Sequence, residues 1–241
     1  MRLNWETQIR GNNVTLVPYT EKHVEKYHEW MKNEKLQHLT GSEPLSLQEE
    51  YEMQKAWRDD SDKVKPLVFR IESLMKHSIY PNWYFTRNVY ESYFLQCTFI
   101  VLSNELLEKN LGNEIASMIG DTNLFISQDK DVENNENILS AEVEIMVAEE
   151  SQRGKKFGFN ALCLMMNYGI EHLKINQFEA KIKCDNVSSI KLFEKLGFKE
   201  STRSEIFKEI TYTLDGSNLT EFRNQISTII LTSTTSKYKH E

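Results

Sequence analysis

A basic loop that contains two glycines joins a predicted strand to a predicted helix. It reads Arg153-Gly154-Lys155-Lys156-Phe157-Gly158, after the alternating pattern of residues 140–148 and before an apolar helical face at residues 159–170. The first N–H groups of a helix have no acceptor within the helix, and with the helix dipole they bind anions such as a pyrophosphate. Glycine admits a phosphate to the backbone, and three cationic side chains add charge. A surface loop that only caps the helix explains this loop, taken alone, equally well.

Two carboxylates precede this loop on the predicted strand. Glu142 and Glu144 are two residues apart, so their side chains share one face of the strand, while Val143 and Ile145 face the other. Neighbouring carboxylates raise the pKa of at least one of the pair and attract a cationic amine. The pattern therefore predicts general bases for an amine substrate, with a solvated polar strand face as the alternative.

A second motif follows the next predicted strand, at residues 178–183. Residues 186–198 read Asn-Val-Ser-Ser-Ile-Lys-Leu-Phe-Glu-Lys-Leu-Gly-Phe. Together, Arg-x-x-x-x-Gly and this Asn-x-x-Ser-x-x-Leu-Phe-Glu-Lys-Leu-Gly-Phe pattern resemble the acyl-CoA site of GCN5-related N-acetyltransferases. The resemblance extends to the N-acetyltransferase 9 branch, a eukaryotic group linked to acetylation of tubulin N-termini, and covers residues 1–214 except 64–96. Its further matching segments are residues 16–19, 27–31, 42–45, 48–51, 119–125 and 142–147.

The resemblance implies a fold, a cofactor and roles for particular residues. The fold is a single α/β domain whose mixed central sheet is splayed at the acyl-CoA site and flanked by helices. Acetyl-CoA is the co-substrate, no metal is needed, and an amine attacks the thioester directly. Glu142 and Glu144 are the catalytic bases. The implied cofactor contacts are the strand backbone at Ile145, Met146 and Val147, the loop amides of Arg153, Gly154, Lys155, Lys156, Phe157 and Gly158, and the side chains of Asn186, Ser189 and Phe193.

Two positions depart from the family pattern. Lys156 stands where the loop usually has glycine, and Phe193 stands where many members carry a tyrosine proposed as the general acid. Phenylalanine cannot donate a proton to a leaving thiolate. Two functions follow: an N-acetyltransferase that modifies a protein N-terminus, tubulin by resemblance, or a catalytically weak acetyltransferase fold that serves as a binding module, for example on microtubules.

Hydrophobic patterns predict the elements that position these residues. Strands are expected at residues 14–17, 97–102, 118–126, 140–148, 178–183 and 206–214, and helices at about 20–33, from Ser46 to the acidic run at 59–62, at 159–170, around 190–193 and at 220–231. Ser46 and Glu49 match a capping box. Residues 1–214 are predicted to form the catalytic domain, and residues 215–241 a C-terminal helix with a frayed, flexible tail.

Composition limits the remaining possibilities. The chain has 241 residues and a formal charge of −7, which argues against a nucleic-acid surface built on bulk positive charge. No apolar run is long enough to span a membrane. Three cysteines without disulfide or metal spacing predict a reducing compartment, cytoplasmic or nuclear, of which we take the cytoplasmic, and Cys163 and Cys184 are expected to serve packing. His23 and His28 are expected at the surface.

Residues 64–96 interrupt the resemblance. They are rich in aromatic residues, contain Pro66 and Pro81, and show no sustained period of either helix or strand. Their first codons, for Val-Lys, are compatible with a splice donor, and their last, for Phe-Leu-Gln, with an acceptor. We interpret the segment as a retained, unspliced intron in the gene model, with a natural surface insertion as the alternative. Transcripts that run through these codons with no spliced form would refute the intron.

Overall fold

A mixed sheet of nine strands forms the centre of the molecule. The computed structural model describes residues 3–59, 95–130 and 137–240. Within them the strand order is β7-β8-β6-β5-β4-β3-β2-β1-β9, and β5–β6 is the parallel pair in an otherwise antiparallel sheet. The strands are β1 (Thr7–Arg10), β2 (Val14–Pro18), β3 (Leu95–Ser103), β4 (Met118–Lys130), β5 (Asn137–Val147), β6 (Gln177–Lys183), β7 (Lys199–Ser204), β8 (Glu209–Leu214) and β9 (Thr234–Lys237).

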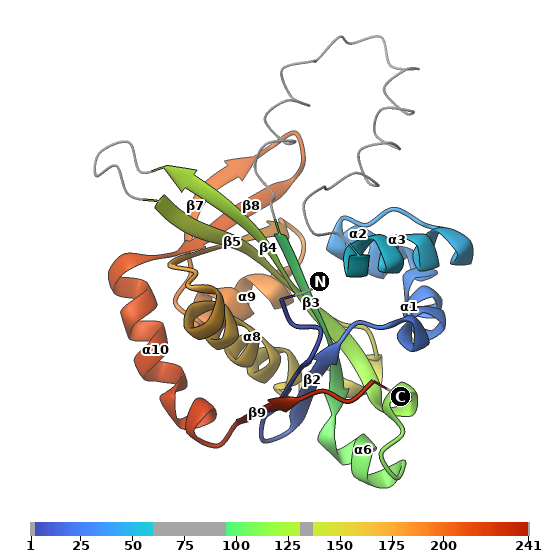
Figure 1. Cartoon of the computed structure of the whole chain (residues 1–241). Helices are drawn as coiled ribbons and strands as arrows, with labels where there is room; N and C mark the ends of the chain where they lie inside the picture. Colours follow the sequence, from blue (N-terminus) through green and yellow to red (C-terminus); the bar gives the residue numbers. More distant parts are fainter. Residues whose placement is uncertain (1–2, 60–94, 131–136, 241) are drawn as a thin grey trace.

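Helices cover both faces of the sheet (Figure 1). One apolar cluster joins alternate strand residues such as Leu16 and Val143 to α8, α9 and α10. The other joins the opposite set, including Val17 and Met146, to α1 and α2. The helices are η1 (Glu21–His23), α1 (Val24–Met31), α2 (Glu34–Thr40), α3 (Leu47–Asp59), α6 (Asn104–Lys109), α7 (Glu114–Ser117), η2 (Glu150–Gln152), α8 (Phe157–Leu173), α9 (Val187–Lys195) and α10 (Gly216–Leu231).

Local sequence explains where these helices begin. The Ser46 N–H donates to the Glu49 carboxylate at 2.8 Å and the Glu49 N–H donates back to Ser46 Oγ at 3.3 Å, so the predicted capping box opens α3. In α8 no charged residue precedes Glu171, and the residues from Ala161 to Met166 are all buried. Helix α8 is therefore hydrophobic on nearly every side and lies against the sheet.

The sheet splits between β5 and β6, as the resemblance implies. Parallel pairing joins Ser140, Ala141 and Glu142 to residues 177–179 and then stops. Strand β5 nevertheless continues to Val147, still paired with β4, and β6 continues to Lys183, paired with β8. Within the described part of the chain, the last residues of β5 thus have no strand partner on the β6 side. This is the predicted α/β fold with a splayed mixed sheet.

The C-terminal tail differs from the frayed segment expected from its Ser/Thr-rich sequence. Residues 234–237 form β9, which pairs antiparallel with residues 7–10 of β1 and closes one edge of the sheet. Tyr238 is buried and donates a hydrogen bond to the Glu114 carboxylate at 2.9 Å. Backbone pairing with an edge strand does not require apolar side chains, so hydrophobic pattern alone misses it.

His23 also differs from its expected surface position. Its side chain is fully buried, Nδ1 accepts from the Thr20 backbone N–H at 3.0 Å, and Nε2 lies 3.3 Å from Glu114. The ring therefore caps η1 and joins it to α7. Burial lowers the pKa of His23, and the hydrogen bond with Glu114 opposes that shift. His28 is half-buried on α1.

Further expectations about the elements need correction. The strand expected over residues 206–214 is shorter, and it forms a hairpin with β7, which the hydrophobic pattern did not predict. Strand β1 and helices α2, α6 and α7 were not predicted either. Residues 64–94 of the suggested insertion lie outside the described residues, and residues 95 and 96 begin β3.

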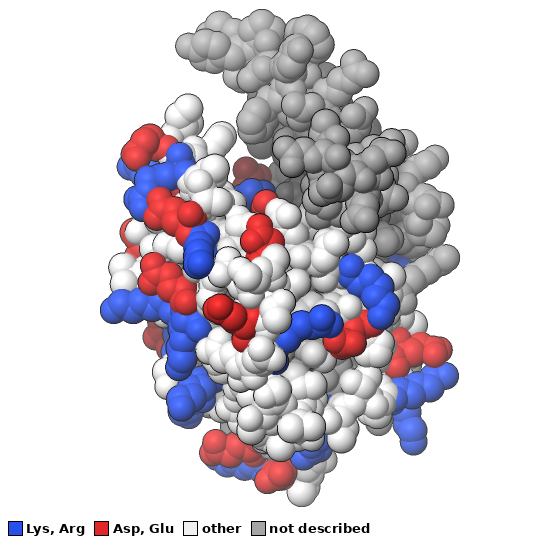
Figure 2. All heavy atoms as spheres, turned by 90° about the vertical axis from the view of Figure 1, so that its left-hand side faces the viewer, with Lys and Arg blue, Asp and Glu red and all other residues white. Residues whose placement is uncertain are grey.

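Neither a membrane span nor a metal site is found in the part of the chain that the structure describes. No described helix is long and apolar enough to cross a membrane. No group of three or more His, Cys, Asp or Glu side chains among the described residues could hold a metal ion. On the face presented in Figure 2, acidic and basic side chains are interleaved.

Candidate active site

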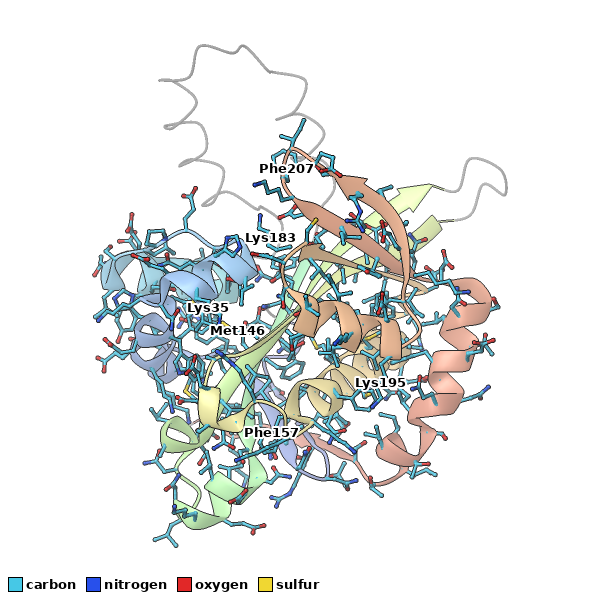
Figure 3. All side chains as sticks on the ribbon, turned by 180° about the vertical axis from the view of Figure 1, so that it is seen from behind. Lys35, Met146, Phe157, Lys183, Lys195 and Phe207 are labelled. Atoms are coloured by element: carbon cyan, nitrogen blue, oxygen red, sulfur yellow. The ribbon has the colours of Figure 1, made fainter. Side chains whose placement is uncertain are left out.

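The end of β5, the start of α8 and helix α9 converge at Gly158. A Cβ placed on this glycine would lie 3.4 Å from Val147, 3.7 Å from Ile145 and 3.8 Å from Leu192. Figure 3 shows Met146 near the end of β5, with Phe157 at the start of α8 and Lys195 on α9. The two sequence motifs therefore meet at the open side of β5, as the resemblance implies.

Arg153 holds the loop against the end of β5. Its guanidinium donates to the Val147 carbonyl at 2.9 Å and to the Ala148 carbonyl at 3.0 Å, and it contacts the Glu150 carboxylate at 3.3 Å. Its backbone N–H donates to the Glu150 carbonyl at 3.1 Å. Arg153 thus positions the loop, and the amides best placed for an anion are those that follow it.

The first turn of α8 lacks the features that usually satisfy a helix N-terminus. Its N-cap residue, Lys156, makes no side-chain capping bond, and the first turn contains no acidic residue. The N–H groups of Phe157 and Gly158 consequently keep their capacity to donate to a bound anion. Lys155 and Lys156 are exposed beside them and add positive charge.

Lys156 adopts a backbone conformation that glycine reaches without strain. Its φ and ψ are 63° and 12°, in the left-handed region. Neighbouring Gly154 also has a positive φ of 76°. Lys156 therefore keeps the loop in this conformation at the cost of backbone strain, and its side chain is exposed.

Replacing Lys156 with glycine should stabilise the protein. We expect the Lys156→Gly variant to gain about 0.5–1 kcal/mol in free energy of unfolding, because relief of left-handed strain exceeds the added entropy of the unfolded glycine. Urea unfolding measures this. Lys155→Gly is the matched control, since Lys155 has no positive φ to relieve and should lose stability. Equal losses of unfolding free energy in both variants would show that Lys156 is not strained.

The second motif supplies a capped helix and a buried ring. Asn186 caps α9, and its Oδ1 accepts from the Ser189 N–H at 3.2 Å, which leaves the Nδ2 amide as a donor. Phe193 is 2% exposed and packs edge-on against Phe198, with ring centroids 5.0 Å apart. In this position Phe193 contributes to the core, and it has no hydroxyl to act as an acid.

Glu142 and Glu144 lie on one face of β5, as predicted, but their surroundings differ. Glu142 is opposite Glu179, at the last pair before the split, and accepts from Lys181 Nζ at 2.6 Å. Glu144 is the next residue on that face, beyond the split. Burial, with the charges of Glu142 and Asp121, raises the pKa of Glu144 to about 8.

A third carboxylate, Asp121, was not predicted from the sequence. It lies on β4 opposite Met146, and its neighbour on the same face, Asn123, is opposite Glu144. Asp121 is 3% exposed, and burial raises its pKa to about 7. Its Oδ2 accepts from Asn123 Nδ2 at 2.8 Å. The sequence could have indicated this residue, because Asp121 is the one acid in the largely apolar strand pattern of residues 118–126. Burying an acid costs free energy, so an acid in such a strand points to a function.

A mixed sheet that splits beside an open, basic helix N-terminus defines an acyltransferase fold that takes its acyl group from a coenzyme A thioester. The chain belongs to the acetyltransferase (GNAT) family, whose domain model matches residues 13–199. It is accordingly an acetyl-CoA-dependent N-acetyltransferase.

Similar proteins confirm the resemblance to the N-acetyltransferase 9 branch. The chain is 44% identical to alpha/beta-tubulin-N-acetyltransferase 9 of Drosophila melanogaster, over 88% of each chain. It is 40% identical to an N-acetyltransferase 9-like protein of Nematostella vectensis, over 94% of this chain and 95% of the relative. Among solved structures, the ribosomal L7/L12 alpha-N-protein acetyltransferase RimL, in complex with coenzyme A, shares the fold with a TM-score of 0.54 at 14% identity, over 86% of this chain and 96% of that one.

The residues present fit acetyl-CoA. The end of β5 offers backbone groups to which β6 does not pair, and Gly158, which has no side chain, lies beside them. The start of α8 offers N–H donors. When bound there, acetyl-CoA supplies an acyl carbon activated by its thioester. The protein's contribution is to orient the amine, remove its proton and exclude water.

Proposed function

We propose that this enzyme acetylates the N-terminal α-amine of a protein and that Glu144 accepts the proton of that amine. The observation that carries the proposal is the position of Glu144, a half-buried carboxylate with a raised pKa at the mouth of the split sheet. Glu142 is paired with Lys181 and supports Glu144 through its charge.

The pKa of Glu144 favours an α-amine over a lysine side chain. An α-amino group has a pKa of about 7.7–8.0, whereas a lysine amine has a pKa of about 10.4. Proton transfer from an α-ammonium to a carboxylate with a pKa of about 8 is nearly balanced in free energy. The same transfer from lysine is uphill by roughly two pKa units, or about 3 kcal/mol.

Tubulin is the proposed protein substrate, because the Drosophila relative is named for alpha/beta-tubulin. A tubulin substrate places the reaction in the cytoplasm. The absence of a hydroxyl at Phe193 is the one observation that favours the alternative, a slow acetyltransferase fold that acts mainly as a binding module, for example on microtubules.

The test combines binding with turnover. Calorimetric titration with acetyl-CoA measures cofactor binding, and acetylation of peptides from α- and β-tubulin N-termini is compared with that of the same peptides blocked at the N-terminus and carrying a free lysine. We expect binding and turnover of the free N-termini alone. Binding without turnover would support the binding module, and acetylation of the lysine peptides would overturn the α-amine assignment.

A further inference from the structure

Three buried side-chain oxygen atoms, on α3 and on the sheet face that it covers, have no hydrogen-bond partner among the described residues. They are Tyr19 OH, Glu50 Oε2 and Asp121 Oδ1, and their residues are 0%, 2% and 3% exposed. Buried polar groups are almost always paired, because removing them from water without a replacement partner costs free energy. Three such atoms in one region therefore require an explanation, and two of them are carboxylate oxygens.

The fold brings these atoms from three elements to one face of the sheet. Tyr19 directly follows β2, Asp121 lies on β4, and Glu50 lies on α3, which covers that face. Gln54, one turn beyond Glu50, donates its side-chain amide to the Tyr19 carbonyl at 3.1 Å and ties the helix to the end of β2. Asp121 precedes Asn123 on this face, and Asn123 is opposite Glu144.

Electrostatic interactions link Tyr19 to both carboxylates, although none of the three atoms bonds to another. Burial, followed by the charges of Glu50 and Asp121, raises the pKa of Tyr19. Burial and then the charges of Asp121, Tyr19, Glu50 and Glu144 raise the pKa of Tyr27 on α1. The cluster therefore extends to Glu144, the proposed base.

The described surroundings supply little compensating positive charge. His28 Nδ1 of α1 is also buried without a hydrogen-bond partner among the described residues, and it lies 3.9 Å from Glu50 Oε1, at the limit of an ion pair. Lys181 of β6 bonds to Glu142, farther along the same face, and partly offsets the rise in the pKa of Glu144. The negative charge of Glu49 instead raises the pKa of Glu50, and that of Glu142 raises the pKa of Glu144. The cluster is suited to receive a cation.

We propose that Tyr19, Glu50 and Asp121 form the binding site for the acceptor's primary ammonium group and deliver it to Glu144. This inference rests on the amine-acetylating part of the proposed function and not on tubulin as the substrate. An ammonium group carries three N–H donors, and the cluster offers three atoms that accept hydrogen bonds and that no described residue satisfies. A water molecule carries only two donors and no charge to balance the carboxylates.

This arrangement also accounts for product release. Acetylation converts the ammonium into a neutral amide with a single N–H, so the carboxylates lose both the charge and most of the donors that they bind. The product is consequently held less strongly than the substrate. The nitrogen gives up two protons in this conversion: Glu144, at the edge of the same cluster, receives the first and frees the amine, and the second neutralises the coenzyme A thiolate that leaves as the thiol.

Thermal unfolding in simple ammonium salts tests the site without any turnover. At pH 8 and matched ionic strength, we expect methylammonium chloride to raise the Tm of the wild type more than tetramethylammonium chloride does, because only methylammonium can donate hydrogen bonds. The Asp121→Asn and Glu50→Gln variants should lose this difference. Glu52→Gln, an exposed residue of the same helix, should keep it. Equal shifts from both salts in the wild type would overturn the proposal.

The same variants separate binding from a purely structural role. Without added amine at pH 8, Asp121→Asn should have a Tm at or above that of the wild type, because it removes an uncompensated buried charge; a lower Tm would indicate that Asp121 serves the fold. For a peptide that the wild type acetylates, KM should rise by about ten- to a hundredfold in each variant while the Kd for acetyl-CoA stays unchanged. A selective methylammonium effect with no turnover of any tubulin peptide would support the site and reject only the proposed substrate.

Discussion

The Glu144→Gln variant is expected to lose about a hundred- to ten-thousandfold in kcat, the range for removal of a general base. Glutamine has nearly the same shape but cannot accept the proton of the attacking amine. Since Glu144 lies beyond the last β5–β6 pair while the cofactor contacts are assigned to the backbone and to α8, the Kd for acetyl-CoA should remain unchanged. Steady-state kinetics and calorimetry measure the two quantities separately.

The pH dependence gives this prediction a second readout. The pKa of Glu144 is about 8, so the residue is mostly protonated at pH 6 and becomes an effective base as the pH rises. Wild-type kcat should therefore increase between pH 6 and about 8 and then level off. Glu144→Gln should lose the contribution of this base and keep only the rise that follows deprotonation of the α-amine itself, whose pKa is about 7.7–8.0.

Glu142→Gln is the matched control for the base assignment. It removes the ion pair with Lys181 at 2.6 Å and one of the charges that raise the pKa of Glu144, while Glu144 itself remains. We expect a pH profile shifted to lower pH and a much smaller loss of kcat than in Glu144→Gln. If Glu142→Gln lost more kcat than Glu144→Gln, Glu142 and not Glu144 would be the base.

The same raised pKa values predict how stability changes with pH. Burial raises the pKa of Glu50 and Asp121 to about 7, and that of Glu144 to about 8, above their ordinary values. Between those ordinary values and about pH 8 the folded protein thus binds more protons than the unfolded chain. Its free energy of unfolding therefore falls as the pH rises through this window. Buried acids without a compensating partner thus lower stability at the pH where they serve the reaction.

Local sequence was sufficient to predict the elements of the cofactor site. The alternation at residues 140–148 predicts a strand with Glu142 and Glu144 on one face, and the register with β4 confirms it. The loop from Arg153 to Gly158 could be placed at the start of a helix because glycines and an apolar helical period adjoin it. Each of these features depends on residues close together in the chain.

The amine side of the site could not be predicted in this way. Tyr19, Glu50 and Asp121 are far apart in the sequence, and none belongs to a local motif that indicates chemistry. Only the register of β4 and the packing of α3 place them on one face. The C-terminal strand escaped prediction for a related reason, because its pairing with β1 depends on backbone groups that every sequence possesses.

The Gly120→Ala variant is expected to lose both stability and acetyl-CoA binding. A Cβ at Gly120 would lie 1.8 Å from the Met146 carbonyl oxygen, 2.8 Å from its carbonyl carbon and 3.1 Å from the Val147 Cα. All three atoms belong to the backbone, so no side chain can rotate to relieve the overlap. Strand β5 must move away from β4 at the residues assigned to the cofactor, and we expect a loss of about 3 kcal/mol or more in free energy of unfolding.

Gly154→Ala is the control that isolates this steric effect. Gly154 has a φ of 76°, and a Cβ added there would meet no described atom within 4 Å. Alanine at this position therefore adds only left-handed backbone strain of about 1–2 kcal/mol. Urea unfolding and calorimetric titration with acetyl-CoA should show a much larger defect in Gly120→Ala than in Gly154→Ala. Equal stability losses would mean that β4 and β5 separate easily at Gly120, and that their close approach is not what fixes the end of β5 beside the loop.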